Sequence, residues 1–320
     1  MPPELIAADD DSIARAGRLI VQGALVAFPT ETVYGLGADA TNDGAVAAIF
    51  EAKGRPRFNP LIVHLPDRES ADRHVRFTDD ADKLARAFWP GGLTLVLPRR
   101  PDCILSLLVS AGLDTVALRV PAHPVAHRLL LAAGRPIAAP SANASGRISP
   151  TRAEHVLQSL GQASALKLIL DGGACAMGLE SSVVGFPAAG PTLLRPGAIA
   201  REAIEAVLGC KLIEAVPLSG EAGRASPGQI ESHYAPDVAI RLNALEARAG
   251  ESLLGFGPLM PDVPGLNLST AGDLREAAAQ LFSMLRELDA MGKPIAVMPI
   301  PETGLGEAIN DRLRRAAAPR

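Results

Sequence analysis

The segment KGRPRFNP, residues 53–60, brings three cations and an amide side chain together within eight residues. Its glycine and two prolines disfavour a regular helix, so we expect a loop that presents its charges instead of burying them. Closely spaced cations repel one another unless an anion lies between them, and guanidinium groups bind phosphate oxygens through paired hydrogen bonds. The segment therefore predicts a site for a phosphate-bearing small ligand, with a solvated basic loop as the alternative.

Arg119 lies inside the apolar run TVALRV, residues 115–120, where an unpaired guanidinium would cost several kcal/mol. It needs an anion, which is either an internal Asp or Glu or the carboxylate of a bound ligand. His64 lies in the apolar run LIVHL. Two interpretations are open for it: a histidine hydrogen-bonded within the core, or an imidazole beside a bound carboxylate or carbamate.

Two hydroxyl-rich segments follow apolar runs and precede glycines or a helix start. TETVYGLG, residues 30–37, gathers Thr30, Glu31, Thr32 and Tyr34. PSANASGRISPT, residues 140–151, leads to a helix that we expect to begin near residue 150. Polar groups at strand ends line ligand crevices in α/β sheets, and helix N-termini favour anions. Taken alone, residues 30–37 are better explained as an ordinary turn, and loops of the composition of 140–151 often have no binding role.

Ser181, Ser182 and Arg195 lie in two further segments of this kind, GLESSVVGF and LLRPGAI. The chain has no GxxxxGK[ST] phosphate loop and no GxGxxG fingerprint, so a nucleotide site here is of another design. A GxSxG elbow is also absent, and nothing marks a Ser/His/Asp triad or a pair of acid–base carboxylates. We therefore do not expect covalent catalysis.

Short apolar runs alternate with segments of helical periodicity through the first two thirds of the chain. The runs predict strands at 24–29, 61–65, 93–98, 115–120, 136–140 and 181–186, and the intervening segments predict helices near 43–52, 79–89, 123–133 and 151–159. This alternation indicates an α/β domain. Several connections are too short for a crossover helix, so we expect a mixed sheet.

Periodicity is lost between about 213 and 236, where Gly, Pro and Ser predominate as in a connecting segment. A smaller α/β unit is expected at 237–320, with strands at 238–242 and 294–300, an amphipathic helix at 272–291 and a terminal helix from about 306. Such a short unit has a thin core, so we expect it to lean on the first domain, residues 1–212.

The 320-residue chain is 48% hydrophobic with a net charge of -4, and its first 220 residues carry 21 cations against 22 anions. This balance disfavours strong nonspecific binding of nucleic acid. The N-terminus does not resemble a secretion signal, and no stretch predicts a membrane span. Three widely separated cysteines form neither a disulfide framework nor a zinc motif. We expect a soluble cytoplasmic protein without membrane contact.

Seven segments, in this order, resemble the YrdC-like threonylcarbamoyl-adenylate synthases: PTETVYGLG, KGRPRFNPLIVH, PGGLTLVLP, TVALRVP, APSANASG, ESSVV and LLRPGAI. The SPG…HYAP linker and the two helical segments near the C-terminus resemble the long form of that family. The resemblance implies a YrdC-like catalytic domain at 1–212, an open twisted mixed sheet with flanking helices. It also implies a linker or lid at 213–236 and a small Rossmann-like α/β domain at 237–320.

By this resemblance the protein is a nucleotidyltransferase. It is expected to convert L-threonine, bicarbonate or CO2, and ATP to L-threonylcarbamoyl-AMP and pyrophosphate, with ATP as a substrate and with Mg²⁺. The product would feed a downstream tRNA threonylcarbamoyl-transferase complex that modifies adenosine 37 of tRNA, and weak contact with tRNA is expected.

The resemblance also implies roles for individual residues. The residues matching the threonine site are Thr32, His64, Arg119, Ala139 and Ser181, and those matching the ATP site are Arg55, Asn59, Thr115, Ser141, Asn143, Ser149, Arg195 and Tyr234. Lys53 and Arg55 match the residues that stabilise the reacting phosphates, and no side chain is predicted as a metal ligand. The chain departs from the family at SPGQIESHYAP, which lacks basic residues before HYAP, and at ESSVVG, where a glycine replaces the final carboxylate of the family's ESTVVD.

Two rival functions remain at this point. One is an RNA-binding module, since YrdC-like folds have a positively lined concave surface, but the near-neutral charge of residues 1–220 weighs against it. The other is a maturation factor that uses carbamoyl phosphate, which is disfavoured because its acylphosphatase and zinc-finger segments are absent.

Overall fold

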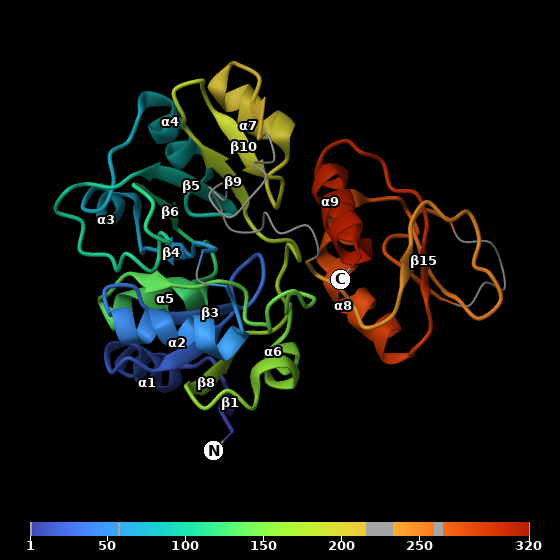
Figure 1. The fold of residues 1–320 in the computed structure, drawn as a ribbon, viewed down its shortest axis with the longest axis horizontal. Helices are drawn as coiled ribbons and strands as arrows, with labels where there is room; N and C mark the ends of the chain where they lie inside the picture. The colour runs from blue at the N-terminus through green and yellow to red at the C-terminus, as the bar shows by residue number, and fades with distance from the viewer. Residues whose placement is uncertain (1, 57, 216–232, 259–264, 320) are drawn as a thin grey trace.

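The computed structural model describes residues 2–56, 58–215, 233–258 and 265–319 (Figure 1). In this part of the chain a mixed sheet of 11 strands and a parallel sheet of 4 strands each pack against helices. These two sheets confirm the predicted mixed sheet and the second, smaller α/β unit. The Rossmann-like character of the smaller unit and the boundaries at 212 and 236 stay predictions, and most of the expected linker, residues 216–232, lies outside the described residues.

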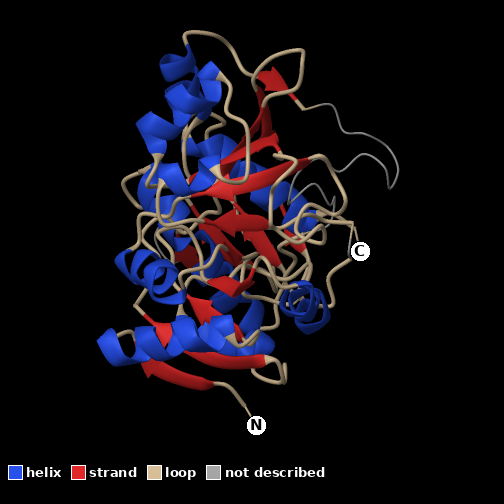
Figure 2. Cartoon of the chain, turned by 90° about the vertical axis from the view of Figure 1, so that its left-hand side faces the viewer, coloured by secondary structure: helices blue, strands red, loops and turns tan. Residues whose placement is uncertain are grey.

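The large sheet has the strand order β1-β8-β2-β3-β7-β4-β6-β5-β9-β10-β11. Its strands are β1 Glu4–Ala7, β2 Leu25–Phe28, β3 Gly35–Asp39, β4 Ile62–His64, β5 Leu93–Pro98, β6 Thr115–Arg119, β7 Ile137–Ala138, β8 Leu166–Asp171, β9 Ser182–Gly185, β10 Thr192–Arg195 and β11 Ile213–Glu214. Figure 2 shows strands lying one above another from the bottom to the top of the view, with helices beside them. The helices are α1 Asp10–Val21, α2 Asp43–Lys53, α3 Arg68–Asp72, α4 Asp79–Phe88, α5 Pro124–Ala133, α6 Ala153–Leu160 and α7 Arg201–Leu208.

All six strands and four helices predicted for this unit are confirmed within a few residues at each end. Other elements were not predicted from the sequence, among them α1, β3 and β8. β3 was overlooked because its sequence, GLGAD, has two glycines and weak strand propensity. Only the packing explains Gly37, because a Cβ there would lie 2.8 Å from the Phe28 ring and 2.9 Å from Ile137.

Helix α2 corrects the expectation of an exposed basic loop. The Asn42 side chain caps its N-terminus, and the helix continues through Lys53 to Gly54, whose left-handed backbone (φ 58°) ends it. Lys53 therefore lies in the last turn of a packed helix and is only 3% exposed. The expectation was wrong because the breaking effect of Gly54 and Pro56 begins one residue after Lys53.

The smaller unit has the strand order β12-β15-β13-β14, all parallel. Its elements are β12 Ile240–Arg241, β13 Ser252–Gly255, β14 Gly265–Asn267, α8 Leu274–Ala290, β15 Ile295–Val297 and α9 Leu305–Ala317. Figure 1 shows α8 and α9 on the side of this unit that faces the large sheet.

The core of the smaller unit is shared with the larger one, as expected. Val33, Ile148 and Leu179 from the large unit belong to the same buried cluster as Leu281 and Phe282 of α8. The two units approach each other closely at Gly178, where a Cβ would lie 2.4 Å from the carbonyl oxygen of Ala278. The helical face that carries these apolar residues is therefore buried between the two units.

Candidate active site

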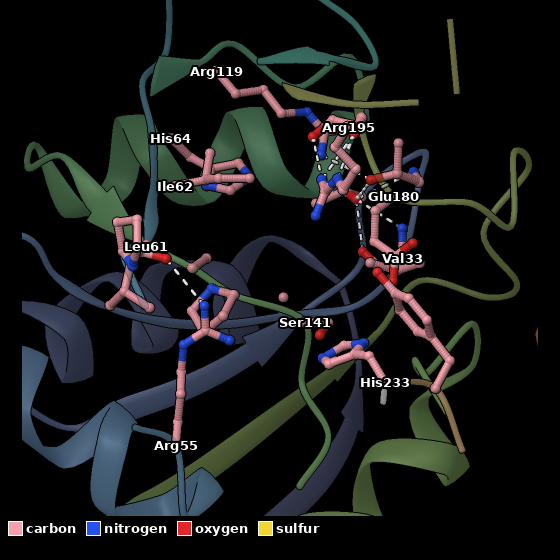
Figure 3. Close-up of a pocket in the computed structure, with 18 residues that line it drawn as sticks. Val33, Arg55, Leu61, Ile62, His64, Arg119, Ser141, Glu180, Arg195 and His233 are labelled. Carbon is pink, nitrogen blue, oxygen red and sulfur yellow. Dashed lines mark hydrogen bonds between the residues drawn. The ribbon is translucent and has the colours of Figure 1, made fainter. Parts of the chain in front are cut away.

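A pocket of about 600 Å³, counting the solvent at its mouth, opens beside β4 and β6 (Figure 3). It is lined by Thr30, Thr32, Val33, Gly35, Arg55, Pro60, Leu61, Ile62, His64, Arg119, Ala139, Pro140, Ser141, Glu180, Ser181, Arg195, His233 and Tyr234. Figure 3 shows the labelled side chains around a central space, with Arg119 near the top of the view and Arg55 and His233 near the bottom.

The register of β4 against β6 brings His64 beside Arg119 at one end of the pocket. Arg119 is buried and donates to three acceptors: Nε to the Gly91 carbonyl at 3.0 Å, Nη1 to Thr32 Oγ1 at 2.8 Å and Nη2 to Glu31 Oε1 at 2.6 Å. The Glu31 carboxylate is thus an internal anion of the kind that the buried Arg119 was expected to need. Because the Arg119 guanidinium also donates to Thr32, the orientation of this guanidinium toward the pocket is fixed.

Two pKa shifts describe the electrostatics of this end. Burial raises the pKa of Glu31, but the charge and hydrogen bond of Arg119 outweigh it and leave that pKa below its usual value, so Glu31 is ionised. Burial lowers the pKa of His64 to about 3, and the nearby charge of Arg119 acts in the same direction. His64 is therefore a neutral imidazole at pH 7, and its buried Nδ1 has no hydrogen-bond partner.

Arg195 and Ser181 meet at a second place in the pocket wall. Nε and Nη2 of Arg195 donate to the Ser181 carbonyl at 3.1 and 2.8 Å, and Nη2 also reaches Ser181 Oγ at 3.1 Å. The same hydroxyl lies 2.7 Å from Thr94 Oγ1. The side chains at the ends of β5, β9 and β10 are therefore linked in one buried network.

Glu180, the residue before this serine, is a pocket carboxylate held from both sides. Its Oε1 accepts a hydrogen bond from Ser149 Oγ at 2.5 Å, and its Oε2 accepts one from Arg312 Nε of α9 at 2.9 Å. Burial raises its pKa, while Arg312, then Arg195 and Ser149, lower it to about 2. The smaller unit thus contributes a charge that acts directly on the pocket wall.

His233 and Tyr234 enter the pocket from the residues just before the smaller unit. Their rings pack edge to face with centroids 4.0 Å apart, and Tyr234 stacks on Phe282 of α8 at 5.5 Å. Tyr234 has a left-handed backbone (φ 64°), a strained conformation for a non-glycine residue. Burial lowers the pKa of His233 to about 3, so it too is neutral at pH 7.

Lys53 and Arg55 have different surroundings although they are two residues apart. Lys53 Nζ donates to the carbonyls of Ser141, at 2.6 Å, and Asn143. Arg55 donates to the carbonyls of Asn59 and Pro60 and lines the pocket. Burial, together with the charge of Arg55, holds the pKa of Lys53 well below its usual value.

The structure brings nine of the site residues named from the sequence to the pocket lining: Thr32, Arg55, His64, Arg119, Ala139, Ser141, Ser181, Arg195 and Tyr234. The other five, Lys53, Asn59, Thr115, Asn143 and Ser149, do not line it. Four of these are within one to three residues of a lining residue or hydrogen-bonded to one, whereas Thr115 begins β6, at the opposite end from Arg119.

Sequence reasoning missed two contributors, Glu180 and Arg312. Glu180 had a local signal, since it is the single carboxylate in GLESSVVGF. Arg312 had none, because an arginine near the end of an amphipathic helix ordinarily faces solvent. Across the described ranges, no group of three or more His, Cys, Asp or Glu side chains is arranged to hold a metal ion. Every helix in those ranges is too short or too polar to traverse a bilayer.

The fold and the pocket define an α/β protein with a pocket lined by arginines, imidazoles and hydroxyls. A family model described as telomere recombination matches residues 18–197, and one described as the C-terminal domain of threonylcarbamoyl-AMP synthase matches residues 199–318. The chain is 41% identical to the threonylcarbamoyl-AMP synthase of Bacillus subtilis strain 168, over 98% of this chain and 95% of that protein. The chain belongs to the threonylcarbamoyl-AMP synthase family.

Two further comparisons involve the archaeon Pyrococcus abyssi. Its threonylcarbamoyl-AMP synthase is 40% identical over 94% of this chain and 93% of that protein. The crystal structure of P. abyssi Sua5 complexed with L-threonine covers 99% of this chain and 97% of its own, with a TM-score of 0.88 and 37% identity. The similarity therefore extends over both sheets.

Proposed function

We propose that this protein condenses L-threonine, bicarbonate or CO2, and ATP into L-threonylcarbamoyl-AMP with release of pyrophosphate. The observation that carries the proposal is that Arg55 and Arg119 line one pocket together with Arg195. Buried polar atoms without a hydrogen-bond partner gather there as well: His64 Nδ1 and His233 Nδ1 belong to lining residues, and the side-chain amide of Asn59 adjoins lining Pro60. Such atoms are costly to bury unless a ligand pairs with them.

We assign the end of the pocket around Arg119 to L-threonine. The Arg119 guanidinium would hold the substrate carboxylate, while the Thr32 and Ser181 hydroxyls and the Ala139 backbone orient the rest of the amino acid. His64 is neutral, so it would act as a hydrogen-bond partner of the carboxylate or of the carbamate. The P. abyssi Sua5 structure complexed with L-threonine, similar over nearly the whole chain, supports the proposal that this chain binds L-threonine.

We assign the remainder of the pocket to ATP. Arg55, Ser141, Arg195 and Tyr234 would contact the nucleotide from the lining, with Asn59, Asn143 and Ser149 behind them. Thr115 remains a proposed ATP residue, at a greater distance along β6. Lys53 would act partly through the loop that it holds, since its ammonium group bonds the carbonyls of Ser141 and Asn143.

The chemistry needs positioning and charge stabilisation more than covalent help. The deprotonated amine of threonine attacks CO2 to form a carbamate, and a carbamate oxygen then attacks the α-phosphorus as the bond to pyrophosphate breaks. Negative charge grows on phosphate oxygens in that step, where Arg55 and Lys53 would stabilise it. Mg²⁺ would enter with the substrate as MgATP, bound mainly by phosphate oxygens and water.

We further propose that residues 1–212 carry this chemistry, that 213–236 connect the units and that 237–320 form the second domain. The product would pass in the cytoplasm to a tRNA threonylcarbamoyl-transferase complex, with at most weak contact between this chain and tRNA. The near-neutral charge of the first 220 residues supports this last point.

The test is pyrophosphate release by the purified protein with ATP and Mg²⁺. Release is expected only when L-threonine and bicarbonate are both present, and Arg55→Ala is expected to reduce it strongly without unfolding the protein. Turnover with L-serine equal to that with L-threonine would contradict the proposed pocket for the threonine methyl group. Tight, steeply salt-dependent tRNA binding without adenylate formation would favour the RNA-binding alternative instead.

A further inference from the structure

Arg312 is an unusual residue for the last helix of a small appended unit. It is fully buried and the largest such side chain in the described residues. Nε donates to Glu180 Oε2 at 2.9 Å, Nη1 donates to Asp311 Oδ2 at 2.6 Å, and the guanidinium carbon lies 5.3 Å from the centre of the Tyr234 ring. Arg312 thus contacts two pocket-lining residues without lining the pocket itself.

Stability alone is a weak reason for such a pair. Burying an arginine and a glutamate removes both charges from water, and a buried ion pair often gives no more stability than a well-packed apolar pair would. The two units already have another ion pair, in which Arg201 of α7 holds Glu307 of α9 through Nε and Nη2. That pair is partly exposed and neither residue lines the pocket.

The negative charge of Glu180 is unfavourable for phosphate binding unless a cation such as Arg312 balances it. It is a carboxylate in the wall of a pocket that, by our assignment, receives the phosphates of ATP, and like charges repel strongly in a poorly solvated site. The charged and titratable groups that face it are Arg312 from α9, Arg195 from β10, Lys53 from α2, and His233 and Tyr234 from the residues before the smaller unit. Without Arg312, Arg195 would be the remaining arginine whose charge lowers the pKa of Glu180.

We propose that Arg312 is a positioning residue of the nucleotide site: by pairing with Glu180 it neutralises that carboxylate and leaves the positive charge of Arg195, whose Nε and Nη2 bond Ser181, available to a phosphate. This inference rests on the proposed function, since it requires an anionic nucleotide near Arg195. It gives the smaller unit a definite task. That unit supplies the counter-charge that makes the pocket wall suitable for a phosphate.

The experiment compares the dissociation constant of ATP, measured by calorimetry, with kcat and KM in the adenylate assay for four full-length variants. Arg312→Gln is expected to raise the Kd and KM for ATP roughly tenfold with a much smaller change in KM for threonine. Arg312→Lys, which keeps the charge, is expected to bind ATP within about threefold of wild type. The double variant Glu180→Gln with Arg312→Gln is expected to recover most of the lost affinity, because no unpaired carboxylate remains.

Arg201→Gln is the matched control, since it removes an Arg–Glu pair from the same interface away from the pocket. Equal ATP affinity in folded Arg312→Gln and Arg201→Gln, or a double variant no better than Arg312→Gln, would overturn the inference. If Arg312→Gln does not fold, Arg312→Lys and the double variant decide: ATP affinity more than about tenfold below wild type in both overturns it, and near-wild-type affinity in both supports it. A wild-type protein that binds ATP but forms no adenylate would overturn the proposed function, while the Kd comparison still judges Arg312.

Discussion

Arg119 and Glu31 form an ion pair inside the pocket wall, with 2.6 Å between Nη2 and Oε1 and with side chains only 4% and 10% exposed. The pair orients a guanidinium that also donates to Thr32. The second oxygen of Glu31, Oε2, is buried without a hydrogen-bond partner. The arginine therefore has a structural role in addition to any contact with substrate.

Removal of Arg119 is expected to cost stability. Arg119→Met leaves the Glu31 carboxylate buried and unpaired, so the free energy of unfolding should fall by about 3 kcal/mol. Urea denaturation measures this change. The double variant Glu31→Gln with Arg119→Met should be more stable than the single variant, since it has no orphaned charge; a single variant as stable as wild type would contradict the role of the pair.

His64 predicts a pH dependence of stability. Its pKa is about 3 in the folded protein against 6.5 for an ordinary histidine, so the unfolded chain takes up a proton first as the pH falls. The effect of His64 on the free energy of unfolding is therefore constant well above pH 6.5, and this free energy falls progressively as the pH drops from 6.5 to 3. Between pH 7 and pH 5 the loss is about 2 kcal/mol. In urea unfolding, His64→Gln should lose less free energy of unfolding than wild type over this interval. A pH dependence equal to that of wild type would contradict the lowered pKa of His64.

Lys53 and Arg55 are expected to respond differently to substitution. Lys53→Gln removes a charged donor from two backbone carbonyls of the 141–143 loop, so it should lower both turnover and the free energy of unfolding, the latter by about 3 kcal/mol. Arg55→Gln should lower turnover while changing the free energy of unfolding by less than about 1 kcal/mol. Turnover assays and urea unfolding on both variants separate these outcomes, and equal destabilisation would count against the distinction.

Gly178 is expected to control the docking of α8. A Cβ at this position would meet the Ala278 carbonyl at 2.4 Å and the Ala279 backbone at 2.6 Å, and φ is +65°. Gly178→Ala should therefore lower the free energy of unfolding by about 3 kcal/mol. Gly209→Ala is the control, because Gly209 has a similar φ of +72° with open space around it, and it should cost only about 1 kcal/mol. Equal effects in urea unfolding would show that the close approach is unimportant.

Much of the fold was predictable because the signals were local. Strands such as LTLVLP and helices such as that at 274–290 have the hydrophobic period of their final structure, so the mixed sheet and the second unit followed from the pattern. Strand β3 did not, because its two glycines suit close packing on Phe28 more than any intrinsic preference. Lys53 was placed in a loop because a helix end cannot be located to one residue from sequence.

The candidate site likewise has features that the sequence predicts and features that it does not. The kinds of chemical group at the site follow from the amino-acid sequence alone, since seven ordered segments supply cations, hydroxyls and amides for ligands. The partners of these groups depend on the packing of the folded chain: Arg119 pairs with Glu31, Lys53 holds a loop, and Arg312 reaches Glu180 from 132 residues away. This is because the residue type sets the charge of a side chain, whereas its counter-charge is whichever group lies close to it in space. Strand register and helix docking together determine which groups lie close.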